Sequence, residues 1–379
     1  MHVTKLVLRD FRNYERAEVD LAPGLNVAAG QNGAGKTNLL EGIYVGLTGR
    51  SCRTSNDREV VRFGTNVARV EVHVAAPDGE HVLEVGIAPG EEKRIRVDGA
   101  ALQRGVEPPR PLAGVFLPDR LDLVKGAPAL RRAHLDQVVA ALWPARGAAR
   151  ADYSRALAQR NALIARVRAG AAGAAQLDTW DAELARHGAE LMANRAATVE
   201  LIAPAFAARA AELGLPEEAL LGYAPRSKAG DAEGLRAELE ERRAADLDRG
   251  FTTHGPHRDD LALQHGGRAL RSLGSQGQQR LGLLALLFAE RDALAERGTP
   301  PLMLLDDVMS ELDATRRERL SELVRSGGQA LLTTTDADHV PGAAAADTAL
   351  LQVTAGRVLT ATAGGGVEGS GGAPKAAAG

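Results

Sequence analysis

The spacing of apolar positions divides the chain into segments of different character. Within the first 120 residues, short runs rich in β-branched residues alternate apolar and polar positions; the runs are VTKLVL, GLNVAAG, ARVEVHVAA, HVLEVGI and RIRVDG. Turn sequences such as Pro77-Asp78-Gly79 and Asp98-Gly99 separate them. Alternation interrupted by Gly, Pro and Asp is typical of strands. The N-terminal third therefore predicts a mixed β-sheet.

From residue 131 to residue 213 the pattern becomes helical. The segment is rich in Ala, Arg, Glu and Leu, and apolar residues recur at helical spacing, as at Leu177, Trp180, Leu184 and Leu191. A Gly/Ala-rich stretch, residues 170–175, divides it. Two helices of about 35 residues would each extend about 50 Å at about 1.5 Å per residue. The pattern therefore predicts an antiparallel helical arm. Strand-like alternation resumes near Phe251.

Composition limits the class of protein. The 379 residues are 45% hydrophobic and 25% charged, a balance typical of globular domains. A single cysteine, Cys52, excludes a disulfide framework. The longest apolar runs, such as residues 281–289, are too short to span a membrane, and the first residues lack the apolar core of a signal peptide. We therefore expect a cytoplasmic protein that contacts no membrane. Because the net charge is −3, any nucleic-acid site would have to be local.

The clearest chemical motif is GQNGAGKT, residues 30–37, which fits the phosphate-binding pattern G-x-x-x-x-G-K-[ST] at every fixed position. Glycines let successive backbone N–H groups turn toward a phosphate. Lys36 can reach the outer phosphates and Thr37 can place its hydroxyl on Mg²⁺. A Gly-rich turn with a surface lysine is the less favoured alternative. The predicted nucleotide contacts are Gly30, Gln31, Asn32, Gly33, Ala34, Gly35, Lys36, Thr37 and Asn38.

A second motif is an apolar run, residues 302–305, that ends in Asp306 and Asp307. A buried strand that delivers an acid to its carboxyl end is a common way to hold the hydration shell of Mg²⁺. A second acid beside it can orient or deprotonate an attacking water. A strand that ends in solvated acids is the alternative, and the complete phosphate-binding loop makes it the less favoured one. We assign Asp306 to the metal and Asp307 to the water.

A third motif, GSQGQQR at residues 274–280, precedes an apolar helix. Ser and Gly at a helix N-terminus can form an anion-binding surface, although an ordinary helix cap by Ser275 is equally consistent with the sequence. Two phosphate-binding surfaces can serve one nucleotide if they converge. A two-fold dimer can place the second surface of one subunit over the first surface of the other.

The order of these motifs resembles the ABC-type ATPase heads of SMC-like DNA-maintenance proteins: the P-loop, the Ser275-Gln276-Gly277-Gln278 signature, the acidic strand and then Ser310-Glu311-Leu312-Asp313. Within that class the sequence is most similar to the RecF family, over nearly the whole chain except the tail. The resemblance rests on the first fifty residues or so (LVLRDFRNYERAEVDLAPGLNVAAGQNGAGKTNLLEGIYVGLTGRSCRT) and on FLPD, VKGAP, QRN, GPHRDD and GSQGQQR.

The resemblance implies an α/β fold: a P-loop ABC-type ATPase head, with a mixed β-sheet and helices, that carries an inserted α-helical arm. We expect the N-terminal part of the ATPase lobe in residues 1–120 and the helical lobe in residues 121–250. The C-terminal ATPase part, with the signature and the acidic strand, would occupy residues 251–362. Residues 363–379 are mostly Gly, Ala and Ser, so we expect a disordered tail.

The resemblance also implies roles for individual residues. Lys36 and Thr37 would bind the β- and γ-phosphates of ATP and Mg²⁺, with Asp306 at the metal and Asp307 at the attacking water. Arg12 would lie near the nucleotide. The signature residues would contact the γ-phosphate held by the other subunit; they are Ser275, Gly277 and Gln278. Asp313 would lie at the dimer interface.

The Gln that usually links the metal to the helical lobe of ABC ATPases is not obvious, since Pro118-Asp119 occupies that region. The sequence departs from the broader ABC pattern at two further positions. Asp307 stands where many ABC ATPases have Glu. The switch position after the strand at residues 330–332 contains Thr333-Thr334-Thr335-Asp336 where many have His, and Thr335 is our catalytic candidate there. Both departures resemble the RecF pattern.

The function implied by the resemblance is that of an ATP-dependent DNA-binding clamp in recombinational repair. ATP would drive a homodimer onto gapped or junction DNA, and a weak, DNA-stimulated ATPase activity would release it. RecO and RecR would act with it to help load RecA. Another SMC-like DNA-tethering ATPase is the alternative. A transporter subunit is disfavoured because 239 positions filled by a polar helical arm separate Lys36 from Ser275.

Two further features allow weaker interpretations. His254 and His257 have H-x-x-H spacing, but no third ligand is apparent, so we do not predict a metal site there. Arg131 and Arg132, at the start of the arm, could contact a DNA backbone, although a solvated helix face is favoured.

Overall fold

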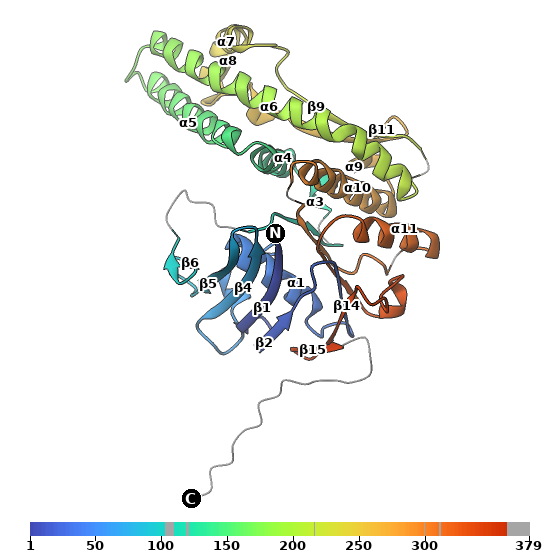
Figure 1. Ribbon diagram of the computed structural model, residues 1–379. Helices are drawn as coiled ribbons and strands as arrows, with labels where there is room; N and C mark the ends of the chain where they lie inside the picture. The colour runs from blue at the N-terminus through green and yellow to red at the C-terminus, as the bar shows by residue number, and fades with distance from the viewer. Residues whose placement is uncertain (103–109, 119–120, 216, 299, 311, 362–379) are drawn as a thin grey trace, which may run out of the picture. The chain divides into compact units, whose positions relative to one another are not determined.

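The computed structural model describes all residues except 103–109, 119–120, 216, 299, 311 and 362–379. Contacts divide the chain into two compact units, shown in Figure 1. Unit 1 comprises Met1–Asp119 and Gly298–Gly379, and unit 2 comprises Arg120–Arg297. Residues 251–297, which the sequence analysis grouped with the C-terminal ATPase part, make their contacts within unit 2. The tail expected to be disordered, residues 363–379, lies outside the described residues.

Four of the five alternating runs of the N-terminal third form strands of an antiparallel sheet in unit 1, with strand order β2-β1-β4-β5-β6-β7, whereas GLNVAAG forms a strand of the second sheet. Its strands are β1 (His2–Phe11), β2 (Tyr14–Asp20), β4 (Ala68–Ala76), β5 (Gly79–Ile87), β6 (Arg94–Val97) and β7 (Ala100–Ala101). Buried apolar and more exposed polar positions alternate along β4, as expected for a sheet with one face on the core.

A second sheet of unit 1 has the strand order β15-β14-β3-β13-β12-β8. Its strands are β3 (Leu25–Ala29), β8 (Ala113–Phe116), β12 (Leu302–Leu305), β13 (Ala330–Thr334), β14 (Ala349–Thr354) and β15 (Arg357–Ala361). All neighbours pair in parallel except β14 and β15. Every residue of β3, β12 and β13 is buried, which explains why their sequences are mostly apolar. The predicted α/β class is confirmed.

Helix α1 (Lys36–Thr48) contacts strands of both sheets and lies in the core of unit 1. Two glycines of α1 allow the helix to lie close to the antiparallel sheet. A Cβ at Gly42 would lie 2.8 Å from a methyl carbon of Leu8, and one at Gly46 would lie 2.2 Å from a methyl carbon of Val72. Because these positions are four residues apart, they share the helix face that meets the antiparallel sheet. Unit 1 also contains the helices α2 (Asp57–Val60) and α11 (Ala314–Arg325).

Unit 2 consists mainly of helices: α3 (Asp122–Lys125), α4 (Pro128–Leu142), α5 (Ala149–Arg168), α6 (Leu177–Glu212), α7 (Ala232–Glu241), α8 (Arg243–Arg249), α9 (Leu270–Leu273) and α10 (Gln276–Ala295). The second predicted arm helix is present as the 36-residue α6. The first is divided into α4 and α5 near Pro144, since proline has no backbone N–H and its predecessor Trp143 is not helical (φ −138°, ψ 84°). In the described part of the chain, no helix combines the length and the apolar character that crossing a membrane requires.

Unit 2 also contains a small antiparallel sheet, β11-β10-β9, that the sequence analysis did not predict within the helical segment. Its strands are β9 (Ala219–Ala224), β10 (Asp260–His265) and β11 (Arg268–Ala269). Strand β9 interrupts residues 121–250, which were expected to be helical. The six residues pair along their whole length with β10, and this long-range pairing is not visible in local helical spacing.

Buried ion pairs connect the helices of unit 2. Arg160 is fully buried and donates to Asp181 (2.6 Å) and Asp246 (2.7 Å). Arg131 is 1% exposed and donates through Nε and Nη2 to Asp260, at 2.6 and 2.9 Å. The interpretation of Arg131 as part of a solvated helix face is therefore wrong, because its guanidinium is paired inside the unit. The QRN and GPHRDD stretches supply several of these groups, so in this structure they stabilise the fold.

Candidate nucleotide-binding site

A loop of residues 30–35 connects β3 to α1. Gly33 and Gly35 have φ angles of 79° and 118°, which residues with a Cβ rarely adopt. Gly30 is needed for another reason, because a Cβ there would lie 2.2 Å from the backbone oxygen of Val353. The three glycines of the motif are thus explained by the local backbone, and they leave the N–H groups at the start of α1 free of neighbouring Cβ atoms.

The turn between β1 and β2 holds this loop in place. Asn13 Nδ2 donates to the backbone oxygen of Ala34 (3.1 Å), and the Tyr14 hydroxyl donates to that of Gly35 (3.0 Å). Burial raises the pKa of Tyr14, so its hydroxyl remains a neutral donor. Sequence reasoning missed both residues, although they directly follow Arg12 in the chain. Their position next to a predicted site residue was the available signal.

Lys36 folds back onto the loop. Its ammonium nitrogen Nζ donates to the backbone oxygens of Gly30 (2.7 Å) and Gln31 (3.0 Å). Burial lowers the pKa of Lys36, and the nearby carboxylates of Asp307 and Asp306 oppose that shift. A phosphate beside the ammonium would act in the same direction as the carboxylates and favour the charged form.

The acidic strand ends beside the loop. Because β12 and β13 are parallel, with Leu305 opposite Leu332, the residues that follow them meet at one edge of the sheet. Thr333 Oγ1 donates to Asp306 Oδ1 at 2.6 Å. Thr37 Oγ1 lies 3.0 and 2.9 Å from the two Asp306 carboxylate oxygens. The fold thus joins two residues 269 positions apart and presents oxygen ligands of the kind that Mg²⁺ prefers.

Opposing effects act on the pKa of Asp306. Burial raises the pKa of Asp306, whereas hydrogen bonds from the Thr333 and Thr37 hydroxyls lower it and the neighbouring Asp307 raises it. Two donors therefore offset part of the penalty for keeping a carboxylate 8% exposed. Sequence reasoning placed Thr333 at the switch position but gave it no role. The parallel register, which brings it beside Asp306, is a tertiary feature.

Asp307 combines two unusual features. Its φ angle is 42°, in the left-handed region, and its Oδ1 is buried without a hydrogen-bond partner among the described residues. Its backbone N–H donates to Thr333 Oγ1 at 3.0 Å. Strained backbone and unpaired buried oxygens are retained mainly where function uses them. The free oxygen can accept a hydrogen bond from a water or ligand, as its predicted role requires.

Arg12 forms a two-pronged ion pair inside unit 1. Its Nε and Nη2 donate to the two carboxylate oxygens of Glu41, at 2.9 and 2.7 Å. Glu41 lies in α1 with no exposed surface, and Arg53 also reaches it at 3.2 Å. In this structure Arg12 neutralises a buried carboxylate behind the loop. Its contact with a nucleotide stays a prediction.

The remaining predicted residues of unit 1 lie around the loop. Gln31 and Asn32 are exposed, and Asn38 Nδ2 donates to Asn13 Oδ1 at 2.8 Å. Thr335 follows β13 and is exposed. In the described part of the chain, the threonine bonded to both acidic residues is Thr333, so a catalytic role for Thr335 has no contact to support it here.

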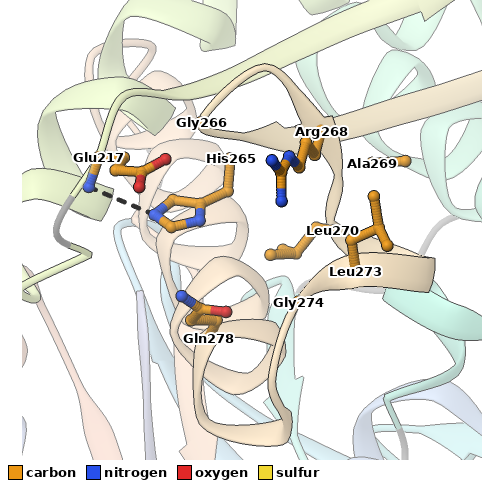
Figure 2. A pocket seen from close by; sticks show the side chains of 9 residues that line it. All are labelled: Glu217, His265, Gly266, Arg268, Ala269, Leu270, Leu273, Gly274 and Gln278. Carbon is orange, nitrogen blue, oxygen red and sulfur yellow. Dashed lines mark hydrogen bonds between the residues drawn. The ribbon is translucent and has the colours of Figure 1, made fainter.

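In unit 2 the signature forms the start of α10. Ser275 and Gln278 make a reciprocal capping box: the Ser275 amide donates to Gln278 Oε1 (2.8 Å), and the Gln278 amide donates to Ser275 Oγ (3.3 Å). Gly277 is exposed, with no atom within 4 Å of a Cβ built there. Figure 2 shows Gln278 and His265 among the side chains that line a neighbouring cavity of about 210 Å³. Ser275 is an ordinary cap by geometry, and its accessible position is compatible with both interpretations of the sequence.

The two histidines with metal-like spacing have other partners. His254 Nε2 lies 2.5 Å from a Glu238 carboxylate oxygen. His257 Nδ1 lies 2.7 Å from the Tyr153 hydroxyl, and its Nε2 lies 3.1 Å from the backbone oxygen of Thr252. Burial lowers the pKa of His257 to about 4. Across the described residues, no group of three or more His, Cys, Asp or Glu side chains is arranged to hold a metal ion.

The geometry of unit 1 defines a class of protein: a P-loop and an acidic strand end meet at one edge of a parallel sheet, beside an antiparallel sheet, as in ABC-type ATPase heads. Solved structures agree at the level of the fold. The Smc head domain of Pyrococcus furiosus with an extended coiled coil is 18% identical, with a TM-score of 0.59 over 95% of this chain and 96% of that one.

More specific comparisons narrow the class. The family model RecF/RecN/SMC N terminal domain matches residues 2–357. The DNA replication and repair protein RecF of Streptomyces avermitilis is 39% identical over 362 residues, which cover 90% of this chain and 95% of the relative. RecF of Frankia alni is also 39% identical, over 365 residues, with the same coverage. A structure of the recombination mediator protein RecF-ATP in the RecFOR pathway is 27% identical, with a TM-score of 0.82 over 95% of this chain and 98% of that one. The chain belongs to the RecF family.

Proposed function

We propose that this chain is an ATP-dependent DNA-binding clamp of recombinational DNA repair. ATP drives two copies into a homodimer that holds gapped or junction DNA, and slow, DNA-stimulated hydrolysis releases it. RecO and RecR act with the dimer to help load RecA. The relatives described as DNA replication and repair proteins, and the RecF-ATP structure of the RecFOR pathway, support the nucleotide and repair parts of this proposal.

One observation carries the proposal: the contact of Thr37 and Thr333 with Asp306 at the mouth of the P-loop. A hydroxyl and a carboxylate are the donor set of a P-loop metal site. The unpaired Asp307 oxygen lies one residue further along the same strand end. The residues present therefore fit ATP with Mg²⁺, and Thr37 and Asp306 are the groups that would hold the ion.

Each group then has a distinct role. The backbone N–H groups of residues 33–37 bind phosphate oxygens, and Lys36 exchanges its two loop carbonyls for the outer phosphates. Asp307 accepts a hydrogen bond from the attacking water through its free oxygen and so orients it. Thr37 and Asp306 would hold Mg²⁺, which would supply positive charge against the negative charge that develops on the phosphates. Thr333 donates a hydrogen bond that lowers the pKa of Asp306, and it fixes the direction of the Asp307 backbone.

The signature supplies the link to DNA. Ser275 and Gly277 are accessible at the N-terminus of the 20-residue helix α10, where a γ-phosphate bound by a second copy would be stabilised by the helix dipole. Two heads held together by ATP double the number of DNA phosphate contacts, which raises avidity without base recognition. Nucleotide state is thereby converted into residence time on DNA.

The test is sedimentation of the full chain with Mg²⁺-ATP, with and without a short gapped duplex. We expect the wild type to dimerise with ATP and then bind the DNA more tightly. Lys36→Met should remove nucleotide binding, whereas Ser275→Arg should still bind ATP but stay monomeric. Ser154→Arg places the same charge at an exposed position of α5 and should behave as the wild type. A wild type that stays monomeric with ATP would rule out the clamp.

A further inference from the structure

The antiparallel sheet of unit 1 carries arginines along one line across its exposed face. The cross-strand register places Arg9 of β1 directly opposite Arg16 of β2 and Arg69 of β4. The line continues through Gly86 of β5 to Arg94 of β6, and all four arginines are exposed. We call Arg16, Arg9, Arg69 and Arg94 the arginine row. With strands about 4.8 Å apart, it spans about 19 Å; Figure 1 shows the strands that carry it.

This arrangement is unfavourable for the sheet itself. Like charges directly opposite each other on neighbouring strands are destabilising. The two members at the ends of the row reach carboxylates, Glu18 at 3.9 Å and Glu91 at 3.4 Å. The two central members, Arg9 and Arg69, form no ion pair with any carboxylate of the described part of the chain. An anion from outside the protein would relieve this repulsion at the centre of the row.

The described acidic residues on the same face form no ion pair with Arg9 or Arg69. They occupy the next line across the strands, where Glu71 and Glu84 stand opposite each other. Glu71 lies 2.7 Å from His73 Nε2, and Glu84 stands directly opposite Arg96 in the register of β5 and β6. The arginines and the glutamates of this face therefore lie on separate, neighbouring lines.

A hollow interrupts the row at Gly86. It has a volume of about 360 Å³, and its charged lining residues are four arginines and two glutamates: Arg9, Arg69, Arg94, Arg96, Glu71 and Glu84. A Cβ at Gly86 would make only ordinary contact, 3.7 Å from the Arg94 Cβ, and its φ angle is not positive. Neither packing nor backbone strain therefore requires glycine here. Its effect is to leave open space between guanidinium groups, where a phosphate could be contacted from more than one side.

A fully exposed aromatic residue lies near the row. Phe63 is 101% exposed, on a turn in which the Thr65 N–H donates to the Arg62 backbone oxygen at 3.1 Å. The Arg62 N–H donates to the backbone oxygen of Asp10 at 2.8 Å, which ties this turn to the residue next to Arg9. An aromatic ring without any packing partner contributes nothing to the core. Beside the arginine row, it offers a flat surface on which a base can stack.

We propose that the arginine row, the hollow at Gly86 and Phe63 bind single-stranded nucleic acid. The arginines contact its phosphates, and an unpaired base stacks on Phe63. Duplex DNA offers phosphates but keeps its base faces stacked, so the exposed ring favours the single strand. The inference rests on the nucleic-acid part of the proposed function and is independent of its ATP-driven dimer, since no residue of the P-loop takes part.

The experiment measures binding of a labelled 20-nucleotide oligothymidine to the full chain by fluorescence anisotropy, without nucleotide, over a range of salt concentrations. The main variant is Arg9→Gln/Arg69→Gln/Arg94→Gln. We expect its affinity to fall about tenfold or more, and the slope of log affinity against log salt to decrease by about 2, since each phosphate contact on a single strand contributes about 0.7. Its stability to urea should not decrease, because repulsion within the sheet is relieved.

One control variant and two further variants test the position of the site. Arg155→Gln/Arg186→Gln/Arg236→Gln removes as many exposed, paired arginines from unit 2 and should bind as the wild type. Phe63→Ala should weaken binding about fivefold or more with an unchanged salt slope, since stacking involves no counterion release. Gly86→Val fills the hollow without changing charge and should also weaken binding.

The proposal is overturned if the triple variant in the sheet binds oligothymidine as the wild type does, or no more weakly than the unit 2 control. It is also overturned if the loss is confined to a 20-base-pair duplex, or if an oligoglutamate of equal charge competes as well as unlabelled oligothymidine. Sedimentation with ATP separates the two proposals. The triple variant should dimerise normally, whereas a wild type that does not dimerise refutes the clamp and leaves the single-strand result standing.

Discussion

Replacing Thr333 by valine tests how the acidic strand end is held. Valine has nearly the shape of threonine but lacks the hydroxyl. That hydroxyl is the single group that both donates to Asp306 Oδ1 (2.6 Å) and accepts from the Asp307 N–H (3.0 Å). Thr333 is fully buried, so water cannot replace it in either bond. The substitution therefore separates the hydrogen bonds from the packing.

The expected loss in free energy of unfolding follows from the two hydrogen bonds of Thr333. A hydrogen bond to a charged group contributes about 1.5–3 kcal/mol, and a buried amide left without a partner costs about 1–3 kcal/mol. Because both depend on one hydroxyl, their effects are not fully additive. We expect Thr333→Val to lower the free energy of unfolding by about 2–4 kcal/mol. Affinity for Mg²⁺-ATP should also fall, about tenfold, since Asp306 and Asp307 lose their fixed directions.

The assay combines urea unfolding with titration of a fluorescent ATP analogue in the presence and absence of Mg²⁺. Thr333→Ser is the matched control, because it keeps the hydroxyl and loses one methyl group, about 1 kcal/mol of burial. Serine should therefore retain most of the affinity for Mg²⁺-ATP. Equal losses in the valine and serine variants would refute the reasoning, because the serine variant keeps the hydroxyl that makes both hydrogen bonds. An affinity loss that is the same without Mg²⁺ would separate Thr333 from the metal site.

Two predictions concern unit 2. The His257 pKa of about 4 lies below the value of about 6.5 for an unfolded chain. As pH falls from 7 to 5, the unfolded state therefore gains a proton that the folded state does not. The protein should lose about 2 kcal/mol of stability over this range. In His257→Gln this component of the loss should be absent, which urea unfolding at the two pH values measures; an equal loss in both proteins would contradict it. Arg160→Met leaves two buried aspartates without their shared partner and should destabilise the fold by about 3–5 kcal/mol in the same assay. Arg155→Met, at an exposed pair on the same helix, should change it little, and similar losses in both variants would argue against a special role for the buried network.

The elements of the fold were predictable where their pattern is local. The strands of the N-terminal third alternate with a period of two, and α6 follows the helical spacing of residues 177–212. The break near Pro144 was not predicted, although the proline itself is visible in the sequence. Strand β9 was missed because its six residues are defined by pairing with β10, a partner some forty positions away. Local spacing carries no information about such a partner.

Within the candidate site, the motif residues could be predicted from the sequence, whereas the residues that contact and orient them could not. The P-loop could be located at single-residue level, because its backbone requires glycine and its chemistry requires lysine and threonine at fixed spacing. Arg131 showed the limit of this reasoning. From the sequence it was a surface charge, whereas in the fold it is 1% exposed and paired with Asp260. A charged residue becomes buried only when another segment delivers its counterion.

The sequence by itself determined the class of this protein, its family, the phosphate-binding loop and the two acidic residues that follow the buried strand. These features depend on short stretches whose residue types are dictated by backbone geometry and by chemistry. Only the tertiary structure decided that Thr37 contacts Asp306 and that Thr333 forms hydrogen bonds with both acidic residues. The same holds for the ion pair between Arg12 and Glu41. The tertiary structure also decided that four arginines from separate strands form one row. Such contacts depend on strand order and register, which are set by the burial of whole sheet faces and cannot be read from any single segment.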